Sequence, residues 1–347
     1  MLAEHLPPHI GGVERHLARV ARDLTERGFE VTLFTVSHCE GLPAEEDWGG
    51  VRVLRSRKSD TRSGELTSVW SSLAKNLRTL ADADIVHLHS PRILTHWFLP
   101  FRLLFLRKPC FITFHGASMR YRPIRKEVLQ KQVAQAFSNG SILVGHFLKK
   151  WFGLKSNFVT WGGVDLPQEA PIAGSNCGAL FLGRLSADTV PLAYLDAMSL
   201  VDRGLRDKMK LTFVGDGPSH AALEEKARRA SFEVRLEGFQ EDPTTYIAGC
   251  GLLFAPGYLS ILEGLAWRRP IFCLAANEMR MDYFSEIAEC SRSIHLAREP
   301  SELARLVGAW LEKSPMEKAE ILEAGFELAR FHSWQKVTDL YISLWQS

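Results

Sequence analysis

The stretch Lys210-Leu-Thr-Phe-Val-Gly-Asp-Gly-Pro218 decides the fold class, because it places a short apolar strand directly before a glycine turn that leads into a helix. Strand-like runs followed by helical patterns recur along the chain, which is typical of parallel sheets with helical crossovers. The strands expected in the first half are Val31–Val36, Val51–Leu54, Ile85–His89, Cys110–Phe114, Ser141–Val144 and Asn157–Thr160. Those expected in the second half are Ala179–Leu182, Lys210–Val214, Glu233–Glu237, Leu252–Ala255 and Pro270–Leu274. We therefore predict an α/β protein with two Rossmann-like, doubly wound parallel-sheet domains.

Chain length and one turn-rich segment divide these strands between two domains. At roughly 150 residues per domain, a chain of 347 residues favours two domains of similar size. The segment Asp165–Asn176 is rich in proline and turn-forming residues and has no apolar periodicity, so it is the expected linker. The predicted domains are residues 1–165 and 166–332.

The small total charge hides an asymmetry between these halves. The chain has 42 Lys+Arg and 40 Asp+Glu residues, a formal charge of +2. The residues before Asp165 hold 23 of the basic and 14 of the acidic side chains, a net charge of +9, and the remainder carries −7. Between Arg92 and Lys155 there are 12 basic residues and a single acid, Glu127. Such an asymmetry indicates an anionic substrate, nucleic acid or membrane surface as a partner of the first domain.

Cysteine usage and the apolar runs favour a soluble protein of the cytoplasm. The six cysteines are scattered with no close pair, which is typical of reduced proteins and argues against a disulfide framework or a zinc site. No signal peptide is visible at the start. The most apolar stretch, Ile93–Leu106, is interrupted by His96, Pro100 and Arg102, so we expect no membrane span.

The opening residues are unusual for a parallel sheet. A glycine loop that contains Gly11 and Gly12 normally follows a first strand, yet only Met1-Leu-Ala3 precedes the loop. We expect that part of the first strand is missing, through a truncated reading frame or a misassigned start codon.

Three glycine motifs are candidates for the ligand crevice of a parallel sheet, and two of them directly follow expected strands. Gly11-Gly12 precedes a helix and suits a phosphate or sugar, although a tight turn needs glycine in any case. Gly183-Arg184-Leu185 places a planar cation at a strand end, where it suits a diphosphate or pairs with a surface acid. Gly215-Asp-Gly-Pro218 resembles only part of a dinucleotide fingerprint, so it is interpreted as a turn near a nucleotide pocket.

An acid and several histidines complete the candidate site. Ser260 and Glu263 have the spacing of a helix capping box, and Glu263 could equally accept hydrogen bonds from ribose hydroxyls. His115 closes an apolar strand and can donate to a sugar hydroxyl, with His87 and His89 as alternatives for that role.

The order of these motifs resembles the retaining glycosyltransferases of family 4 (group 1), which have the GT-B fold. Matching pieces cover nearly the whole chain: Pro8-His-Ile-Gly-Gly-Val-Glu14, Asp84-Ile-Val-His-Leu-His89, Thr113-Phe-His-Gly116, Gly162-Gly-Val-Asp165, Gly183-Arg-Leu185, Gly215-Asp-Gly-Pro218, Glu237-Gly238 with Asp242-Pro243, and Ile261-Leu-Glu-Gly-Leu-Ala266 with Arg269-Pro270. The closing piece Phe331-His-Ser-Trp334 matches the element that crosses back onto the first domain, so residues 333–347 are expected to form that helix.

The resemblance implies a hexosyltransferase that uses a nucleotide diphosphate sugar, retains the anomeric configuration, and requires neither a metal nor a further cofactor. The acceptor would be a glycan or a lipid-linked molecule. His115, Arg184 and Glu263 would be the catalytic residues, with His115 on the donor sugar, Arg184 on the leaving diphosphate and Glu263 on the ribose. Donor binding would involve Gly11, Gly12, Arg184, Gly215, Leu259, Ser260 and Glu263.

The sequence departs from the family pattern at the donor site. Thr189 stands where the family has a lysine, and Ala255 stands where it has the first of two glutamates. The intervening loop is shortened to Pro256-Gly-Tyr258, and His146 replaces an expected serine. We favour a divergent active subfamily. The alternatives are a non-catalytic sugar-nucleotide or glycan-binding module and a GT-B sugar-nucleotide epimerase, with a nicotinamide-dependent dehydrogenase as a distant third.

The resemblance implies that the first domain holds the acceptor, as is usual in this fold, and here that domain is basic. We expect peripheral association with an anionic membrane on its cytoplasmic face and no nucleic-acid partner. For the apolar residues Trp97–Phe105, we favour a core helix over membrane contact. The residues proposed for the acceptor or membrane side are Trp97, Arg102, Arg120, Arg122, Arg125 and Lys126.

Overall fold

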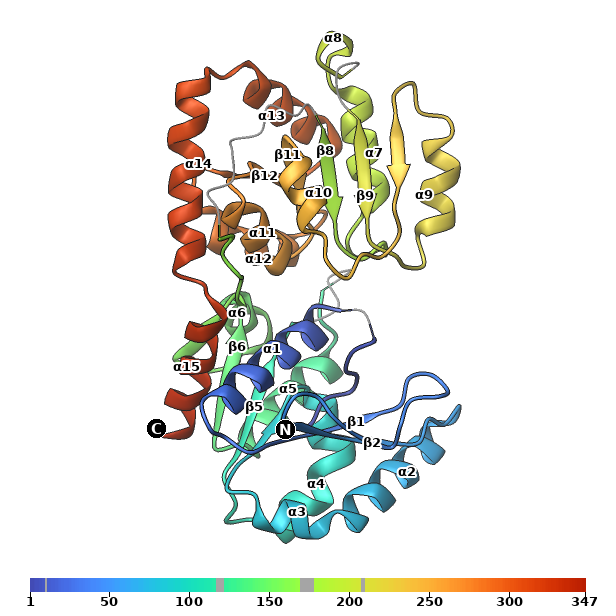
Figure 1. Ribbon diagram of the computed structural model, residues 1–347, viewed down its shortest axis with the longest axis vertical. Coiled ribbons are helices and arrows are strands. Elements are labelled where there is room, and N and C mark those ends of the chain that lie inside the picture. The colour runs from blue at the N-terminus through green and yellow to red at the C-terminus, as the bar shows by residue number, and fades with distance from the viewer. Residues whose placement is uncertain (10, 117–121, 169–177, 207–209) are drawn as a thin grey trace. The chain divides into compact units, whose positions relative to one another are not determined.

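The structure is a computed structural model that describes residues 1–9, 11–116, 122–168, 178–206 and 210–347. The chain divides into two compact units. Unit 1 consists of Met1–Ala117, Pro123–Thr160 and Trp334–Ser347, and unit 2 consists of Ser118–Arg122 and Trp161–Ser333 (Figure 1). The closing helix, residues 334–345, therefore packs with the first part of the chain.

Unit 1 is built on a largely parallel sheet. Its strands are β1 (Val31–Val36), β2 (Glu45–Asp47), β3 (Val51–Ser56), β4 (Val86–Leu88), β5 (Cys110–Phe114), β6 (Gly140–Val144) and β7 (Phe158–Thr160). Its helices are α1 (Gly12–Glu26), α2 (Arg62–Lys75), α3 (Leu77–Asp82), the π-helix η1 (Ile93–Phe98), α4 (Leu99–Leu104), α5 (Arg125–Ala136), α6 (Phe147–Phe152) and α15 (Trp334–Trp345). The strands run in the orders β1-β3-β2 and β4-β5-β6-β7, with β2 antiparallel to β3.

The first residues join these two groups of strands. Leu2 forms parallel bridges to Phe34 of β1 and to Leu88 of β4. The Leu2 N–H donates to the His87 carbonyl at 2.9 Å, and the Phe34 N–H donates to the Met1 carbonyl at 2.9 Å. Met1–Ala3 thus takes the central position between β1 and β4, which is the place of the first strand in a doubly wound sheet.

Unit 2 has a fully parallel sheet in the order β10-β9-β8-β11-β12-β13. Its strands are β8 (Ala179–Leu182), β9 (Leu211–Val214), β10 (Val234–Leu236), β11 (Leu252–Phe254), β12 (Ile271–Leu274) and β13 (Ile294–Ala297). Its helices are α7 (Pro191–Leu200), α8 (Arg203–Arg206), α9 (His220–Ala227), α10 (Thr244–Gly249), α11 (Tyr258–Ala266), α12 (Glu278–Ala288), α13 (Pro300–Glu312) and α14 (Pro315–Arg330). The buried rings of Phe181, Tyr194, Phe213 and Phe254 pack edge-on or tilted, with 5.1–5.3 Å between centroids, and so connect α7 to the strands.

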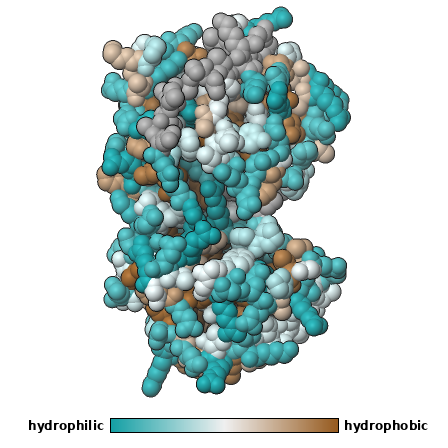
Figure 2. Space-filling model, viewed as in Figure 1, coloured by the Kyte–Doolittle hydropathy of each residue, from teal (hydrophilic) through white to brown (hydrophobic). Residues whose placement is uncertain are grey.

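The predicted α/β class and parallel sheets are confirmed, and all the expected strands form within a residue or two of their predicted ends. Strands β2 (Glu45–Asp47), which has no apolar residue, and β13 (Ile294–Ala297) were missed. The visible face of each unit carries mostly hydrophilic side chains (Figure 2). None of the described helices is long and apolar enough to cross a membrane. The five described cysteines are free thiols.

Candidate functional site

In unit 2, the loops after β8 and β9 interlock at the carboxyl edge of the sheet. Gly215 has φ +142°, and a Cβ there would lie 1.9 Å from the Gly183 carbonyl oxygen. Gly217 has φ +150°, and its Cβ would lie 2.4 Å from the Leu185 carbonyl oxygen. The Leu185 N–H donates to the Asp216 carbonyl at 2.9 Å. These glycines therefore fix the loop that carries Arg184, at the edge where ligands of such sheets bind.

Arg184 is held in place but remains accessible, with a side chain 62% exposed. Its Nη2 pairs with Asp188 Oδ2 at 3.0 Å, and its Nε donates to Ser186 Oγ at 3.1 Å. Burial alone would raise the pKa of Asp188, but the Ser186 hydroxyl and the cations of Arg184 and Arg280 together hold that pKa below its usual range. Asp188 is thus ionised at neutral pH, and it orients a guanidinium whose other N–H groups are available to an anion.

Thr189 has a structural role in the same loop. It is 7% exposed, and its hydroxyl lies 2.5 Å from the Arg184 carbonyl oxygen and 2.9 Å from that of Ser186. The Ser186 N–H donates to the same hydroxyl at 3.2 Å. Thr189, which stands where the family has a lysine, is therefore turned inward and holds the loop together through these hydrogen bonds.

Helix α11 begins at Tyr258, and the predicted capping box of Ser260 and Glu263 is wrong. Ser260 lies in the first turn, where its hydroxyl donates to the Gly257 carbonyl at 2.9 Å and so cannot serve as the N-cap. The helix starts earlier than the pattern suggested because Gly257 is the N-cap and the Tyr283 hydroxyl accepts from the Tyr258 N–H at 2.9 Å. Glu263 is 8% exposed, within the helix.

Leu259 and Ala255 lie near the start of α11. Leu259 is half-buried in the first turn, and its side chain fills the space beside Gly162, where a Cβ would meet it at 2.7 Å. Ala255 is fully buried after β11. The position of the family's first glutamate is therefore closed to solvent in this chain.

Sequence reasoning missed a second cation near this edge, Arg280 of α12. Its side chain is 3% exposed, and its Nη2 donates to the carbonyl of Pro256, just before α11. Its Nε is buried and has no hydrogen-bond partner among the described residues. The signal was an arginine on an otherwise apolar helix face, three residues beyond the loop that follows β12.

In unit 1, Gly11 and Gly12 begin α1, and both are exposed. A Cβ at Gly11 would lie 2.1 Å from Glu14 Oε2, so the glycine makes room for this buried carboxylate. Glu14 in turn binds His9 Nδ1 at 2.7 Å. Glycine at position 11 thus has a local structural reason, independent of any ligand.

Four histidines gather in unit 1: His87 within β4, His89 and His115 just after β4 and β5, and His16 of α1. His115 is half-buried, its Nε2 lies 3.0 Å from His89 Nδ1, and its ring meets that of His16 edge-on at 4.8 Å. The rings of His87 and His89 are 5.0 Å apart. Burial lowers the pKa of His16 to about 4 and holds the pKa values of His87, His89 and His115 well below the ordinary histidine range. The cluster is neutral at pH 7, so His115 can offer a neutral imidazole to a sugar hydroxyl.

A directed chain of hydrogen bonds fixes part of this cluster. Trp345 Nε1 can only donate, and it donates to His87 Nδ1 at 3.0 Å. His87 Nε2–H therefore donates to Thr113 Oγ1 at 2.8 Å, and the threonine hydroxyl donates to the Tyr341 oxygen at 3.0 Å. The Tyr341 hydroxyl then donates to His16 Nε2 at 3.0 Å. Helix α15 thereby sets the tautomers of two histidines.

The structure corrects two of the six residues proposed for the acceptor or membrane side. Trp97 is 1% exposed, and its indole N–H donates to Glu65. Arg102 is 8% exposed, and its guanidinium donates to the carbonyls of residues 105, 106 and 108, which follow α4, and to that of residue 137, which follows α5. Neither side chain can contact a membrane.

The other four residues of that prediction have different placements. Arg125 and Lys126 are exposed in the first turn of α5. Arg122 is exposed and groups with unit 2, where it lines a pocket of about 310 Å³ with Asn277 and Arg298. Arg120 lies outside the described residues. Among the described residues, no three His, Cys, Asp or Glu side chains are placed to hold a metal ion.

Two family models match the chain, one in each half. The model described as Glycosyltransferase Family 4 matches residues 10–152, and that described as Glycosyl transferases group 1 matches residues 177–311. The chain is a family 4, group 1 glycosyltransferase. Comparison with curated proteins finds no match.

Solved structures confirm the GT-B fold of this glycosyltransferase. Sucrose-phosphate synthase from Thermosynechococcus elongatus has a TM-score of 0.77 at 15% identity, over 99% of this chain and 97% of that one. HepE of Anabaena, in complex with UDP, has a TM-score of 0.72 at 16% identity, over 99% and 97%. A trehalose-6-phosphate structure from E. coli, bound with UDP-2-fluoro glucose, has a TM-score of 0.72 at 13% identity, over 100% and 98%.

Lowering the pH should destabilise the glycosyltransferase through its buried histidines. Below pH 6.5 the unfolded histidines bind protons, whereas folded His16 stays neutral down to about pH 4, so the unfolded state binds more protons in this window. The free energy of unfolding should fall between pH 6.5 and 4 by about 1.4 kcal/mol per pH unit for each such histidine. Urea unfolding at pH 7, 6 and 5 measures this slope, which His16→Gln should reduce; an equal slope in both proteins contradicts the assignment.

Tyr341→Phe should destabilise the glycosyltransferase, because it leaves His16 Nε2 without its donor and Thr113 Oγ1 without its acceptor in a buried site. We expect a loss of about 1–3 kcal/mol in the free energy of unfolding. Urea unfolding followed by circular dichroism measures it. The matched control is Tyr246→Phe, which removes a half-buried hydroxyl bonded to Glu237 at 3.3 Å and should cost less. Equal losses in the free energy of unfolding of the two variants would mean that the buried chain of hydrogen bonds contributes no extra stability.

Proposed function

We propose that this glycosyltransferase moves a hexose from a nucleotide diphosphate sugar to a glycan or lipid-linked acceptor, with retention of configuration at the anomeric carbon. The bond between the anomeric carbon and the diphosphate oxygen breaks, and its electron pair leaves with the diphosphate. A bond from an acceptor hydroxyl oxygen forms on the same face of the sugar, and the hydroxyl proton is released. The main demand on the protein is to stabilise the negative charge that develops on the diphosphate.

The observation that carries this proposal is the held but accessible guanidinium of Arg184. Its ion pair with Asp188 fixes its direction, and its planar fork matches two diphosphate oxygens. Buried Arg280, which anchors the loop before α11, adds positive potential at the same edge and offsets the absence of a lysine at Thr189. We assign the diphosphate to these two cations without a metal ion.

Other parts of the proposal draw on helix α11 and on the relatives. In the proposal, Glu263 binds the ribose, and Gly215, Leu259 and Ser260 border the nucleotide. His115 contacts the donor sugar, beside Gly11 and Gly12. Two of the similar structures hold UDP or a UDP-sugar, which favours a uridine donor.

A non-catalytic sugar-nucleotide-binding protein is the second candidate, because closed Ala255 and inward-facing Thr189 remove two groups of the family's donor site. Incubation with radiolabelled UDP-, GDP- and ADP-hexoses, with and without a lipid or glycan extract, separates the two. Release of nucleotide with transfer of label supports the enzyme. Saturable binding without release, across the whole panel, supports the binding protein.

Arg184→Ala should raise the donor KM and lower kcat. The lost charge-assisted contact, worth about 1.5–3 kcal/mol, corresponds to a fall of about 10- to 150-fold in kcat/KM. The matched control is Arg228→Ala, because Arg228 is 64% exposed and pairs with Glu224 at 3.0 Å on the surface of α9. Steady-state kinetics with the best donor tests this. Unchanged kinetics in Arg184→Ala would remove Arg184 from the diphosphate site.

We also propose that unit 1 docks on an anionic membrane, through side chains other than Trp97 and Arg102. Leu103, Leu104 and Leu106 are 54%, 64% and 63% exposed at the end of α4, and exposed Arg107 follows them. Apolar side chains next to cations are the pattern of an interfacial anchor.

Flotation with phosphatidylglycerol vesicles tests this docking. The glycosyltransferase should float with anionic vesicles more than with phosphatidylcholine vesicles, and the double variant Leu104→Glu/Leu106→Glu should float less. The control is Phe331→Glu, which changes an equally exposed residue, 63%, in unit 2. Equal flotation of the wild type on both vesicle types would end the membrane proposal.

A further inference from the structure

Unit 1 contains a pocket of about 650 Å³ in addition to the histidine cluster. Its side chains come from the segments that follow β3, β4 and β5, so it lies at the carboxyl edge of the sheet, where ligands of such sheets bind. This volume is within the range of small-molecule sites. The residues that line it are Ser59, Asp60, Thr61, Arg62, Glu65, Arg92, Thr95, His96, Lys126, Leu129, Gln130 and Val133.

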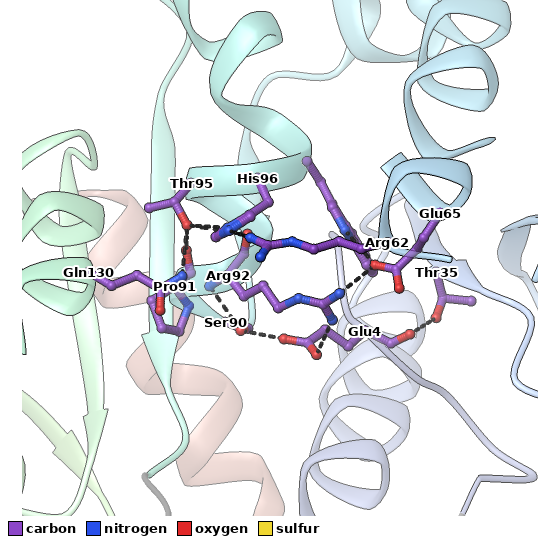
Figure 3. Close-up of polar contacts among 11 residues, drawn as sticks. Glu4, Thr35, Arg62, Glu65, Ser90, Pro91, Arg92, Thr95, His96 and Gln130 are labelled. Atoms are coloured by element: carbon purple, nitrogen blue, oxygen red, sulfur yellow. Dashed lines mark hydrogen bonds and ion pairs between the residues drawn. The ribbon is translucent and has the colours of Figure 1, made fainter. Parts of the chain in front are cut away.

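One of its three cations is already neutralised. Arg92 Nη1 binds Glu4 Oε2 at 3.1 Å, and its Nη2 binds Glu65 Oε1 at 2.6 Å (Figure 3). Glu4 also accepts from Ser90 Oγ at 2.6 Å, and Glu65 accepts from the indole of Trp97. Arg92 is therefore part of the wall, and the two carboxylates bound to it more than offset its single positive charge.

Arg62 has a different kind of partner. Its Nη2 donates to His96 Nε2 at 2.5 Å, and His96 Nδ1–H donates to Thr95 Oγ1 at 2.8 Å (Figure 3). Thr95 in turn donates to the Pro91 carbonyl at 2.9 Å and accepts from Gln130. Burial and the neighbouring cations Arg62, Arg92 and Lys126 lower the pKa of His96, so the imidazole is neutral at pH 7. His96 therefore fixes the direction of the Arg62 guanidinium, and because the imidazole is neutral it does not offset the positive charge.

Lys126 supplies the second uncancelled charge. Within the described ranges, neither Arg62 nor Lys126 has an ion pair with a carboxylate. Arg62 is the first residue of the 14-residue helix α2, and Lys126 lies in the first turn of the 12-residue helix α5. The positive ends of two helix dipoles therefore add to the two cations. Arg62 and Lys126 thus form a positively charged side of the pocket.

The rest of the lining favours a phosphate attached to a larger polar body. Asp60 is an exposed carboxylate, which would repel a bare anion but accepts hydrogen bonds from hydroxyl groups. Leu129 and Val133 form an apolar side. A pocket of about 650 Å³ also exceeds what a single phosphate ion fills. A hydroxylated phosphate ester meets all of these conditions.

We propose that this pocket binds the phosphate ester of the acceptor, with the phosphoryl oxygens on Arg62 and Lys126 and a neighbouring hydroxyl on Asp60. The inference rests on the proposed transferase function, because it names the chemical class of that enzyme's acceptor. The same phosphoryl chemistry is found in soluble sugar phosphates and in the headgroups of anionic lipids.

Calorimetric titration without donor tests the pocket directly. Glucose 6-phosphate should bind the wild type, and its Kd should rise at least tenfold in Arg62→Gln and in Lys126→Gln. The control Arg78→Gln removes a 95% exposed cation of the same unit and should leave the Kd unchanged. Asp60→Asn should weaken glucose 6-phosphate but not inorganic phosphate. Thermal melting verifies that each variant is folded.

Further measurements identify the source of the phosphate and separate this inference from the proposed function. If phosphatidylglycerol vesicles bind in an Arg62-dependent manner and glucose 6-phosphate does not, the ester belongs to a lipid. If neither probe binds, or binding is the same in Arg62→Gln, Lys126→Gln and wild type, the pocket inference is overturned. UDP binding is measured in parallel and reports on unit 2 alone. If UDP binds and neither phosphate probe binds the pocket, the pocket inference fails but the proposed transferase function does not. Arg62-dependent binding with no donor binding or turnover overturns the transferase function instead.

Discussion

The hydrogen-bond chain from Trp345 to His16 is the interaction on which the candidate site of unit 1 depends. A single obligate donor, the Trp345 indole, sets the direction of every later bond through His87, Thr113 and Tyr341. Because the histidines are buried and uncharged, the order of donors and acceptors holds the cluster rather than ion pairing. The position of His115 depends on this arrangement, because its ring packs against those of His16 and His89.

The two units meet the problem of binding anions in different ways. In unit 2 the accessible arginine is oriented by a carboxylate, Asp188, within a loop that only glycines can complete. In unit 1 the accessible arginine, Arg62, is oriented by a neutral imidazole, His96, while two carboxylates more than offset the charge of the neighbouring Arg92. Because the neutral His96 carries no negative charge, it does not reduce the positive potential around Arg62. Arg62 can therefore attract an anion with its full charge.

The strands and the family were predictable because both are encoded locally. Apolar runs such as Cys110–Phe114 are followed directly by histidine or glycine, and that pattern can be recognised without reference to distant residues. The roles of Trp97 and Arg102 were not predictable, because cations and aromatic rings occur both at membrane surfaces and at buried helix ends. Only tertiary contacts, such as the bond from Arg102 to the Phe137 carbonyl 35 residues away, separate the two. Arg280 was missed for the same reason, since its partner at Pro256 is 24 residues away in the sequence.

The place of helix α15 also bears on how the chain is made. Unit 2 is essentially one continuous stretch, Trp161–Ser333, and its two ends pair through the bridge between Val164 and Ser333. Unit 1 instead needs Tyr341 and Trp345, which the ribosome adds after all of unit 2. Unit 1 comes first in the sequence, but its buried histidine cluster therefore stays incomplete until Tyr341 and Trp345 have been made.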